Sequence, residues 1–195
     1  MFRSLYVIVK ENCKIVFRQG AYLAVTFLFL VPYIYGVTNL NSEKAADCLG
    51  KLVALVGIPL FVVVLKPEQD SDICDVILIK KFPYHISILL RIVSAAILSV
   101  FLIYLFALYM LYQGCEFPVC TYTMRTAEIS MLIGGIGLLG SVFFRKTLAG
   151  FLLSVCFVFL FYDDFTVMVV GGIHGFVVSI KILLYSIILL LCDKI

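Results

Sequence analysis

Six long runs of apolar residues constrain this chain more than any other feature of its sequence. Short polar segments separate the runs, which cover Gly20–Val37, Leu49–Leu65, Ile92–Tyr112, Ala127–Phe144, Thr147–Tyr162 and Phe165–Cys192. A helix of about 20 apolar residues crosses the hydrocarbon layer of a bilayer. Of the 195 residues, 64% are hydrophobic and only 14% are charged, which is far from the composition of soluble domains. The sequence predicts an all-α integral membrane protein, with about six transmembrane helices in one transmembrane domain over residues 1–195.

The last apolar run has two interpretations. At 28 residues it is too long for one upright span, and the sequence VVGGIHGF interrupts it. We interpret residues 165–175 as an external re-entrant segment and Phe176–Cys192 as the sixth span. One long tilted helix is the alternative.

The distribution of basic residues predicts the orientation of the chain in the membrane. With the N-terminus inside, eleven lysines and arginines fall on inner segments and only Lys44, Lys51 and Arg125 on outer ones. Cytoplasmic segments of membrane proteins carry such an excess of positive charge. We therefore expect a multi-pass protein of a bacterial plasma membrane with both termini in the cytoplasm.

Residues 1–18 carry a one-sided pattern of charge. At 100° per residue, the basic residues fall within one narrow arc, and the apolar residues occupy the opposite side. This pattern predicts a helix that lies in the membrane surface with its basic side toward lipid headgroups. A basic tail without that helix is the alternative. The basic residues are Arg3, Lys10, Lys14 and Arg18.

A second charged segment, KPEQDSDICD, begins the longest hydrophilic stretch, residues 66–91. Pro67 suits the first turn of a helix, and acidic residues there interact favourably with the helix dipole. Basic residues at the far end complete the pattern, which predicts a cytoplasmic helix over Pro67–Lys81. A solvated loop is the alternative, but the apolar residues of this segment favour contact with a partner. The charged residues are Glu68, Asp72, Asp75, Lys80 and Lys81.

The layout resembles the permease subunits of ABC-2 type ABC transporters. The stretch LKPEQDSDICDVILIKKFPYHISILLRIVSA carries the resemblance, with an acidic segment, a small turn at Pro83 to Ser87, and Arg91 opening the third span. The resemblance implies that residues 66–91 and the N-terminal helix contact separate ATP-binding subunits, which hold ATP and Mg²⁺. It also implies a second permease as partner, either a copy of this chain or a similar one. Membrane lipid is the remaining expected partner, and no nucleic acid is expected.

Two functions follow as hypotheses. The first is the permease subunit of an ATP-driven exporter of an amphipathic or apolar substrate. The second is a non-transporting membrane accessory or immunity protein. The chain has no G-x-x-x-x-G-K-S/T phosphate-binding loop, so we expect no ATP-binding site and no enzyme activity in it. We expect neither a cofactor nor a metal site.

The remaining patterns concern the spans and the connections between them. The glycines of GIGLLG, Gly135 to Gly140, predict close approach of a neighbouring helix. If the helix of the last run is continuous, His174, Lys181 and Tyr185 share one face, which predicts a pathway or subunit contact; a lysine that reaches the outer interface is the alternative.

The connections are predicted as two outer loops and one inner turn. The outer loops are Asn39–Asp47 and Gly114–Met124, and the inner turn is Arg145–Lys146. Cys115 and Cys120 form a disulfide in the second outer loop or remain two free thiols, because spacing alone does not decide pairing.

Overall fold

The computed structural model describes residues 20–65 and 84–161 of the chain, and for residues 84–87 the backbone alone. The regular elements of these ranges are all helical, as the sequence predicts. The elements are α2 (Tyr22–Tyr35), α3 (Ser42–Asp47), η2 (Cys48–Leu52), η3 (Val53–Val56), α4 (Gly57–Val62), η4 (Val63–Leu65), α7 (Tyr84–Tyr112), α8 (Val119–Phe144) and α9 (Thr147–Leu160). The predicted N-terminal helix, the predicted helix Pro67–Lys81 and the last apolar run lie outside the described residues.

Three helices of the described part are long and apolar enough to cross a membrane. They are the composite helix Ser42–Leu65, the helix Ile88–Tyr112 within α7, and α8. Two shorter apolar helices, α2 and α9, have 14 residues each. These features are consistent with a membrane protein, and the number of six spans remains a prediction.

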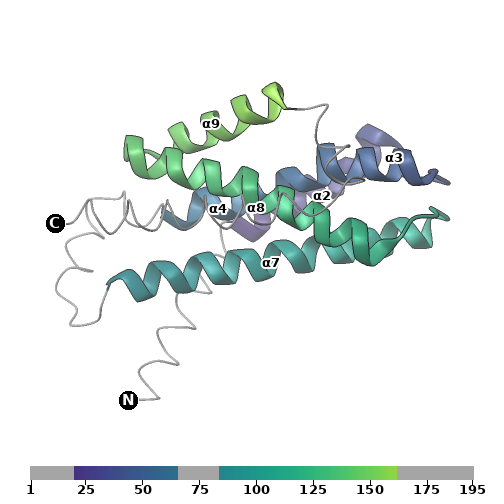
Figure 1. Cartoon of the computed structure of the whole chain (residues 1–195), viewed down its shortest axis with the longest axis horizontal. Helices are drawn as coiled ribbons and strands as arrows, with labels where there is room; N and C mark the ends of the chain where they lie inside the picture. Colours follow the sequence, from purple (N-terminus) through teal and green to yellow (C-terminus); the bar gives the residue numbers. More distant parts are fainter. Residues whose placement is uncertain (1–19, 66–83, 162–195) are drawn as a thin grey trace, which may run out of the picture.

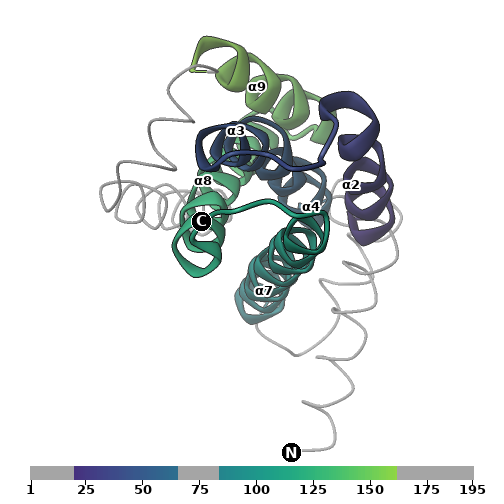
Figure 2. The ribbon, with the colours of Figure 1, turned by 90° about the vertical axis from the view of Figure 1, so that its right-hand side faces the viewer.

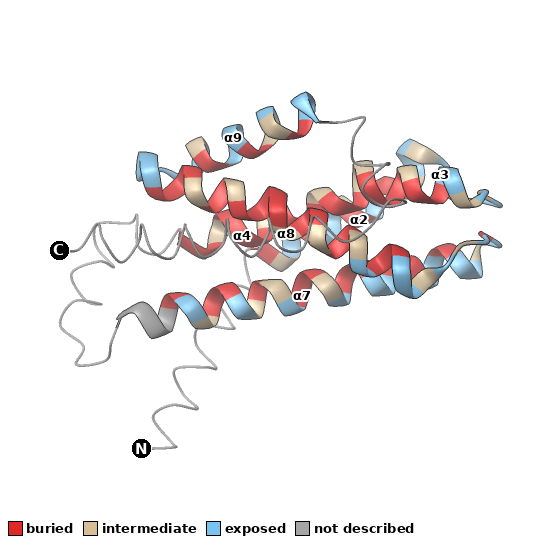
Figure 3. Cartoon of the chain, viewed as in Figure 1, coloured by how far each residue is buried: buried red, intermediate tan, exposed pale blue. Residues whose placement is uncertain are grey.

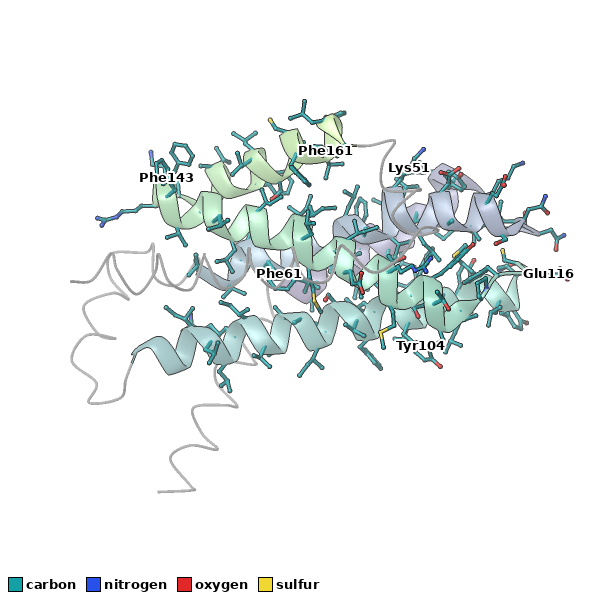
Figure 4. The ribbon with its side chains drawn as sticks, viewed as in Figure 1. Lys51, Phe61, Tyr104, Glu116, Phe143 and Phe161 are labelled. Atoms are coloured by element: carbon teal, nitrogen blue, oxygen red, sulfur yellow. The ribbon has the colours of Figure 1, made fainter. Side chains whose placement is uncertain are left out.

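The helices form a bundle in which successive long helices run in opposite directions (Figures 1 and 2). Helix α8 makes the most widespread contacts, because it packs against α9, α4 and α7 and also against η3. The bundle has two ends. Glu116 lies at one end and Phe143 at the other (Figure 4). We call the first the Glu116 end and the second the Arg91 end, since Arg91 lies in the part of α7 that begins there.

Buried side chains are concentrated in α8 and in the composite helix 42–65, and exposed ones on the outer faces of α7 and α9 (Figure 3). Many of the exposed side chains are large and apolar, among them Phe29, Ile97 and Leu148. Soluble monomers rarely expose so much contiguous apolar surface. Lipid tails would cover these faces in a membrane, so the pattern supports the membrane assignment.

Small residues bring the backbones of α8 and α9 together. A Cβ atom added at Gly137 would collide with Ser154, and one added at Gly150 would collide with Ser141 and with the carbonyl of Gly137. At Gly140 the same atom would lie 3.1 Å from the Cα atom of Gly150. Van der Waals contact and interhelical hydrogen bonds, rather than the hydrophobic effect, hold helices together in lipid, and small residues permit that contact. The close approach predicted for Gly137 and Gly140 is thus confirmed.

Three predicted connections are wrong in part, because helices extend into polar sequence. Residues 42–47 of the first predicted outer loop form α3, whose Glu43 lies in the first turn, where the helix dipole favours it. Residues 119–124 of the second outer loop form the first turns of α8, after Pro118. Residues 84–87 belong to α7 rather than to a turn, so Arg91 lies about two turns inside this helix and does not open it.

The predicted tight turn at Arg145–Lys146 is confirmed, and its position on the inner side of the membrane stays a prediction. Helix α8 ends at Phe144 and α9 begins at Thr147, so Arg145 and Lys146 alone connect them. Arg145 adopts a left-handed backbone with φ of 51°, which reverses the chain within these two residues. Both side chains are exposed.

We expect Gly150→Leu to destabilise the bundle, because the leucine side chain has no space against Ser141 and the backbone of Gly137. Overpacking of this kind costs about 1–3 kcal/mol. Thermal unfolding in detergent, followed by circular dichroism, would measure the loss. Cys156→Leu, at an exposed position of the same helix, is the matched control and should leave the unfolding temperature nearly unchanged. An equal effect of both substitutions would contradict the packing described for Gly150.

Candidate functional site

Of the predicted functional residues, the structure describes only Arg91, and its predicted coupling role stays a prediction. The other predicted coupling residues, the basic residues of the N-terminal helix and the predicted pathway residues lie outside the described residues. They are Glu68, Asp72, Asp75, Lys80, Lys81, Arg3, Lys10, Lys14, Arg18, His174, Lys181 and Tyr185.

Arg91 connects the composite helix 42–65 to α7. Its side chain is only 5% exposed, and Nη1 donates a hydrogen bond to the Val64 carbonyl over 3.4 Å. Val64 lies in η4, the last turn before residue 66, and Arg91 lies in α7. A guanidinium is costly to bury unless its N–H groups find acceptors, so this contact helps to hold the charge among apolar neighbours. Arg91 therefore joins the helix that precedes segment 66–83 to the helix that follows this segment.

Positive charge gathers at this end of the bundle. Arg145 and Lys146, in the α8–α9 turn, lie at the Arg91 end, and neither acidic residues nor histidines occur in the described residues near that turn or in η4. The Glu116 end carries charges of both signs, including the ion pair of Lys51 and Asp47 at 3.3 Å. This asymmetry follows the positive-inside pattern, with the Arg91 end as the expected cytoplasmic end.

The helix between Ser42 and Leu65 is irregular along most of its length. A π turn, η2, is followed by a 3-10 turn, η3, then by the short α4 and another 3-10 turn, η4. Pro59 explains one of these changes, because it has no N–H to donate to the carbonyl of Leu55 in an α-helical pattern. The π turn is wider than an α turn and the 3-10 turn is tighter. The two turns therefore change the winding about the helix axis in opposite senses, and α3 and α4 still belong to one continuous helix.

This irregular helix packs backbone to backbone against α8. A Cβ atom at Gly57 would collide with the backbone and the hydroxyl of Ser130, and one at Gly134 would collide with the ring of Phe61. Phe61 is fully buried and lies near the middle of the bundle (Figure 4). Stretches of 3-10 and π geometry within a helix often mark hinges or functional sites. The contact of α4 with α8 therefore combines an irregular backbone with a close helix approach.

Ser130 presents an unusual polar group at this contact. It is fully buried, and within residues 20–65 and 84–161 its Oγ is a buried side-chain oxygen with no hydrogen-bond partner. Ser154 is also fully buried, but its hydroxyl has hydrogen-bond acceptors. Its Oγ lies 3.0 Å from the Gly150 carbonyl oxygen and 3.3 Å from the Ile133 carbonyl oxygen of α8, and its one hydrogen is shared between them. The second of these bonds joins α9 to α8.

Sequence reasoning missed Gly57, Pro59, Ser130, Gly150 and Ser154. The spacing of Gly150 and Ser154, four residues apart in an apolar run, is a recognisable signal for a packing face. Gly57 and Pro59, two residues apart within the second run, signal an interrupted helix. No sequence pattern marks Ser130, because the missing hydrogen-bond partner of its hydroxyl results from the close packing of Gly57 in the folded bundle.

No group of three or more histidine, cysteine, aspartate or glutamate side chains that could hold a metal ion occurs in the described ranges. Glu128, on α8, interacts electrostatically with Arg125 one turn earlier on the same helix. No family model, no curated protein and no solved structure matches this chain. A function must therefore be argued from the geometry itself.

We expect Arg91→Met to lower the free energy of unfolding by about 1.5–3 kcal/mol, the usual contribution of a hydrogen bond to a charged group. Lys146→Met removes a positive charge at the same end but from an exposed side chain, and should change stability by less than about 0.5 kcal/mol. Thermal unfolding of the purified chain in detergent would compare the two. A loss for Lys146→Met as large as that for Arg91→Met would show that charge alone matters, and not the contact with Val64.

Two serine substitutions should differ in their effect on the free energy of unfolding. Ser154→Ala removes two hydrogen bonds and should lower the free energy of unfolding by about 0.5–1.5 kcal/mol. Ser130→Ala removes a buried hydroxyl without a partner, and should leave stability unchanged or raise it. The same unfolding measurement tests both variants. Destabilisation by Ser130→Ala would mean that its hydroxyl has a partner in the native protein.

Proposed function

We propose that the chain is the membrane-spanning permease subunit of an ATP-driven ABC exporter of the ABC-2 type. The observation that carries the proposal is the buried contact of Arg91 with the Val64 carbonyl. It joins η4, which precedes the acidic-to-basic segment 66–83 in the sequence, to α7, which follows it. A soluble partner that binds this segment would act on two membrane helices together.

The mechanism we propose is a population shift between two arrangements of the permease. Nucleotide binding by the partner ATPase can drive such a change only if the nucleotide-bound partner binds one arrangement more tightly. Glu68, Asp72, Asp75, Lys80 and Lys81 would form the contact with that partner, together with the basic residues of the N-terminal helix. Arg91 would pass the displacement to η4 and α7. A second permease, identical or similar, would complete the transport path.

The irregular helix 42–65 supports a transport function. Interrupted helices are common in transporters, where they lie near the substrate path at the middle of the bilayer. Here the interruptions lie at the most buried element of the bundle, in contact with α8. Few charged side chains line the described helices, which favours an amphipathic or apolar substrate. ATP and Mg²⁺ would be held by the partner subunit.

A non-transporting membrane accessory or immunity protein is the second candidate. The observation that favours it is the length of α9: 14 residues rise only about 21 Å as an α-helix, less than the roughly 30 Å hydrocarbon layer. Short helices are suited to a small protein that binds another membrane protein. Such a protein would need no ATPase and no moving helix.

Co-purification with ATP-binding proteins tests the proposal. The tagged chain and candidate ATPases from the same genome would be expressed together and isolated in mild detergent. We expect an ATPase to co-purify with the wild type and to be lost when Glu68, Asp72 and Asp75 are all changed to lysine, because the reversed charges would repel the docking surface.

Glu43→Lys with Glu116→Lys is the matched control. It also reverses acidic charges, but at exposed positions of the Glu116 end, and it should retain the ATPase. Loss of binding in both variants would indicate a general effect of charge and not a docking segment. If no ATPase binds the wild type, the accessory function is the better explanation.

A further inference from the structure

A patch of exposed apolar and basic side chains lies where α8 turns into α9, at the Arg91 end of the bundle. Phe143 is 76% exposed, Phe144 is 56% exposed and Leu148 is 71% exposed. Arg145 and Lys146, which connect the two helices, are also exposed. Phe143 lies at the outer edge of the bundle (Figure 4). We call these five residues the turn patch.

The two phenylalanine rings of the turn patch lie outside the core. They meet edge to face, with ring centroids 5.1 Å apart and an interplanar angle of 78°. An exposed phenylalanine ring is unfavourable in water, because it has no group that can bond to water and its apolar surface stays hydrated. Hydrocarbon is the surrounding that suits this pair of rings, so the end of α8 lies at the level of lipid tails.

The charges of the turn patch are not balanced by acidic residues nearby in the sequence. Arg145 and Lys146 are the only charged residues between Ile129 and Leu160. A charged side chain is costly in hydrocarbon, so the turn lies at the boundary between the lipid tails and the headgroups. Residues 143–148 therefore present a hydrocarbon-binding surface and two cations side by side.

The backbone at Arg145 is a separate observation. Its φ of 51° lies in the left-handed region, which side chains other than asparagine and aspartate rarely adopt. Many helices end with a residue in this conformation, and glycine is the usual one. The Arg145 amide still donates to the Val142 carbonyl over 3.3 Å. A bulky cation at a position that favours glycine indicates that the side chain has a function.

We propose that the turn patch binds an anionic phospholipid of the membrane. The phosphate oxygens accept hydrogen bonds from the guanidinium of Arg145, a planar group that can donate to two oxygens at once, and Lys146 adds a second positive charge. The acyl chains pack on Phe143, Phe144 and Leu148. The proposal rests on the membrane assignment and on charge complementarity, and it is independent of the proposed exporter function.

An acidic surface of a soluble protein is the competing partner, and the apolar residues of the turn patch argue against it. Such a surface complements the two cations but offers nothing that matches the exposed rings. A phospholipid carries an anion and hydrocarbon in one molecule, in the order in which the turn patch presents their binding groups. Basic residues next to a membrane helix attract anionic lipids, whereas a zwitterionic headgroup carries a cation of its own.

Titration of the purified full chain with phospholipid tests the proposal. The chain is washed in neutral detergent to remove cell lipid, and its unfolding temperature is followed as phosphatidylglycerol or phosphatidylcholine is added. We expect phosphatidylglycerol to act at lower concentration than phosphatidylcholine. Arg145→Gln with Lys146→Gln should weaken the apparent affinity for phosphatidylglycerol about 30-fold, because two basic contacts with the headgroup are lost. The response to phosphatidylcholine should not change.

Two further variants serve as controls. Lys44→Gln with Lys51→Gln removes two positive charges from the Glu116 end, where Lys51 pairs with Asp47, and should retain the wild-type affinity for phosphatidylglycerol. Arg145→Gly separates the side chain from the backbone, because glycine adopts the left-handed conformation without a steric cost. This variant should keep or raise the unfolding temperature in the absence of lipid, while it weakens the binding of phosphatidylglycerol.

Several results would overturn the proposal, and they differ in meaning. Equal weakening in the lysine control would assign the effect to net charge. Equal responses to the two lipids would show that only acyl chains are bound, and an unchanged affinity in the Arg145 and Lys146 variant would place the headgroup elsewhere. Inorganic phosphate that stabilises the chain as strongly as phosphatidylglycerol would identify a free anion as the ligand. Loss of a co-purifying ATPase from this variant, with lipid binding unchanged, would make the turn patch a protein contact.

Discussion

The close approach of helix backbones at α8 is the constraint on which the rest of the structure depends. Glycine and serine residues line both contact faces of α8, toward α9 and toward α4. In lipid, apolar side chains gain little by leaving the surrounding hydrocarbon for one another, so helix association depends on contact distance and on interhelical hydrogen bonds. The bond from Ser154 to the Ile133 carbonyl is one such bond. Larger side chains along α8 would separate all three helices.

The irregular helix 42–65 follows from this packing. Proline and glycine weaken an isolated helix, but neighbouring helices can stabilise an interrupted one inside a bundle. Gly57 packs against Ser130, and Phe61 packs against Gly134, so contacts with α8 stabilise the interrupted segment. The result is a helix that is held firmly by its neighbours while its own hydrogen bonding changes from π to 3-10 to α.

The two ends of the bundle differ in their contacts. At the Glu116 end, hydrogen bonds from Asn39 to Gln113 and between Ser42 and Tyr122 join segments that are far apart in the sequence. At the Arg91 end, the α8–α9 turn has only two residues, and the buried Arg91 joins η4 to α7. The long-range contact at the Arg91 end is the one on which the proposed coupling to a soluble partner depends.

The sequence by itself determined that the chain is helical and apolar enough for a membrane, because an apolar run of this length in lipid must satisfy its backbone hydrogen bonds within the segment, as a helix does. It also predicted the turn at Arg145 and Lys146 and the close packing at Gly137 and Gly140. The helices that begin at Ser42, Tyr84 and Val119 start earlier than the sequence predicted, because hydropathy alone does not distinguish polar residues at a helix end from a loop. Only the tertiary structure decided that Arg91 is buried on the Val64 carbonyl and that the Ser130 hydroxyl lacks a hydrogen-bond partner within the described residues. Each of these depends on residues far apart in the sequence, which meet only because small side chains on α8 let the helices approach.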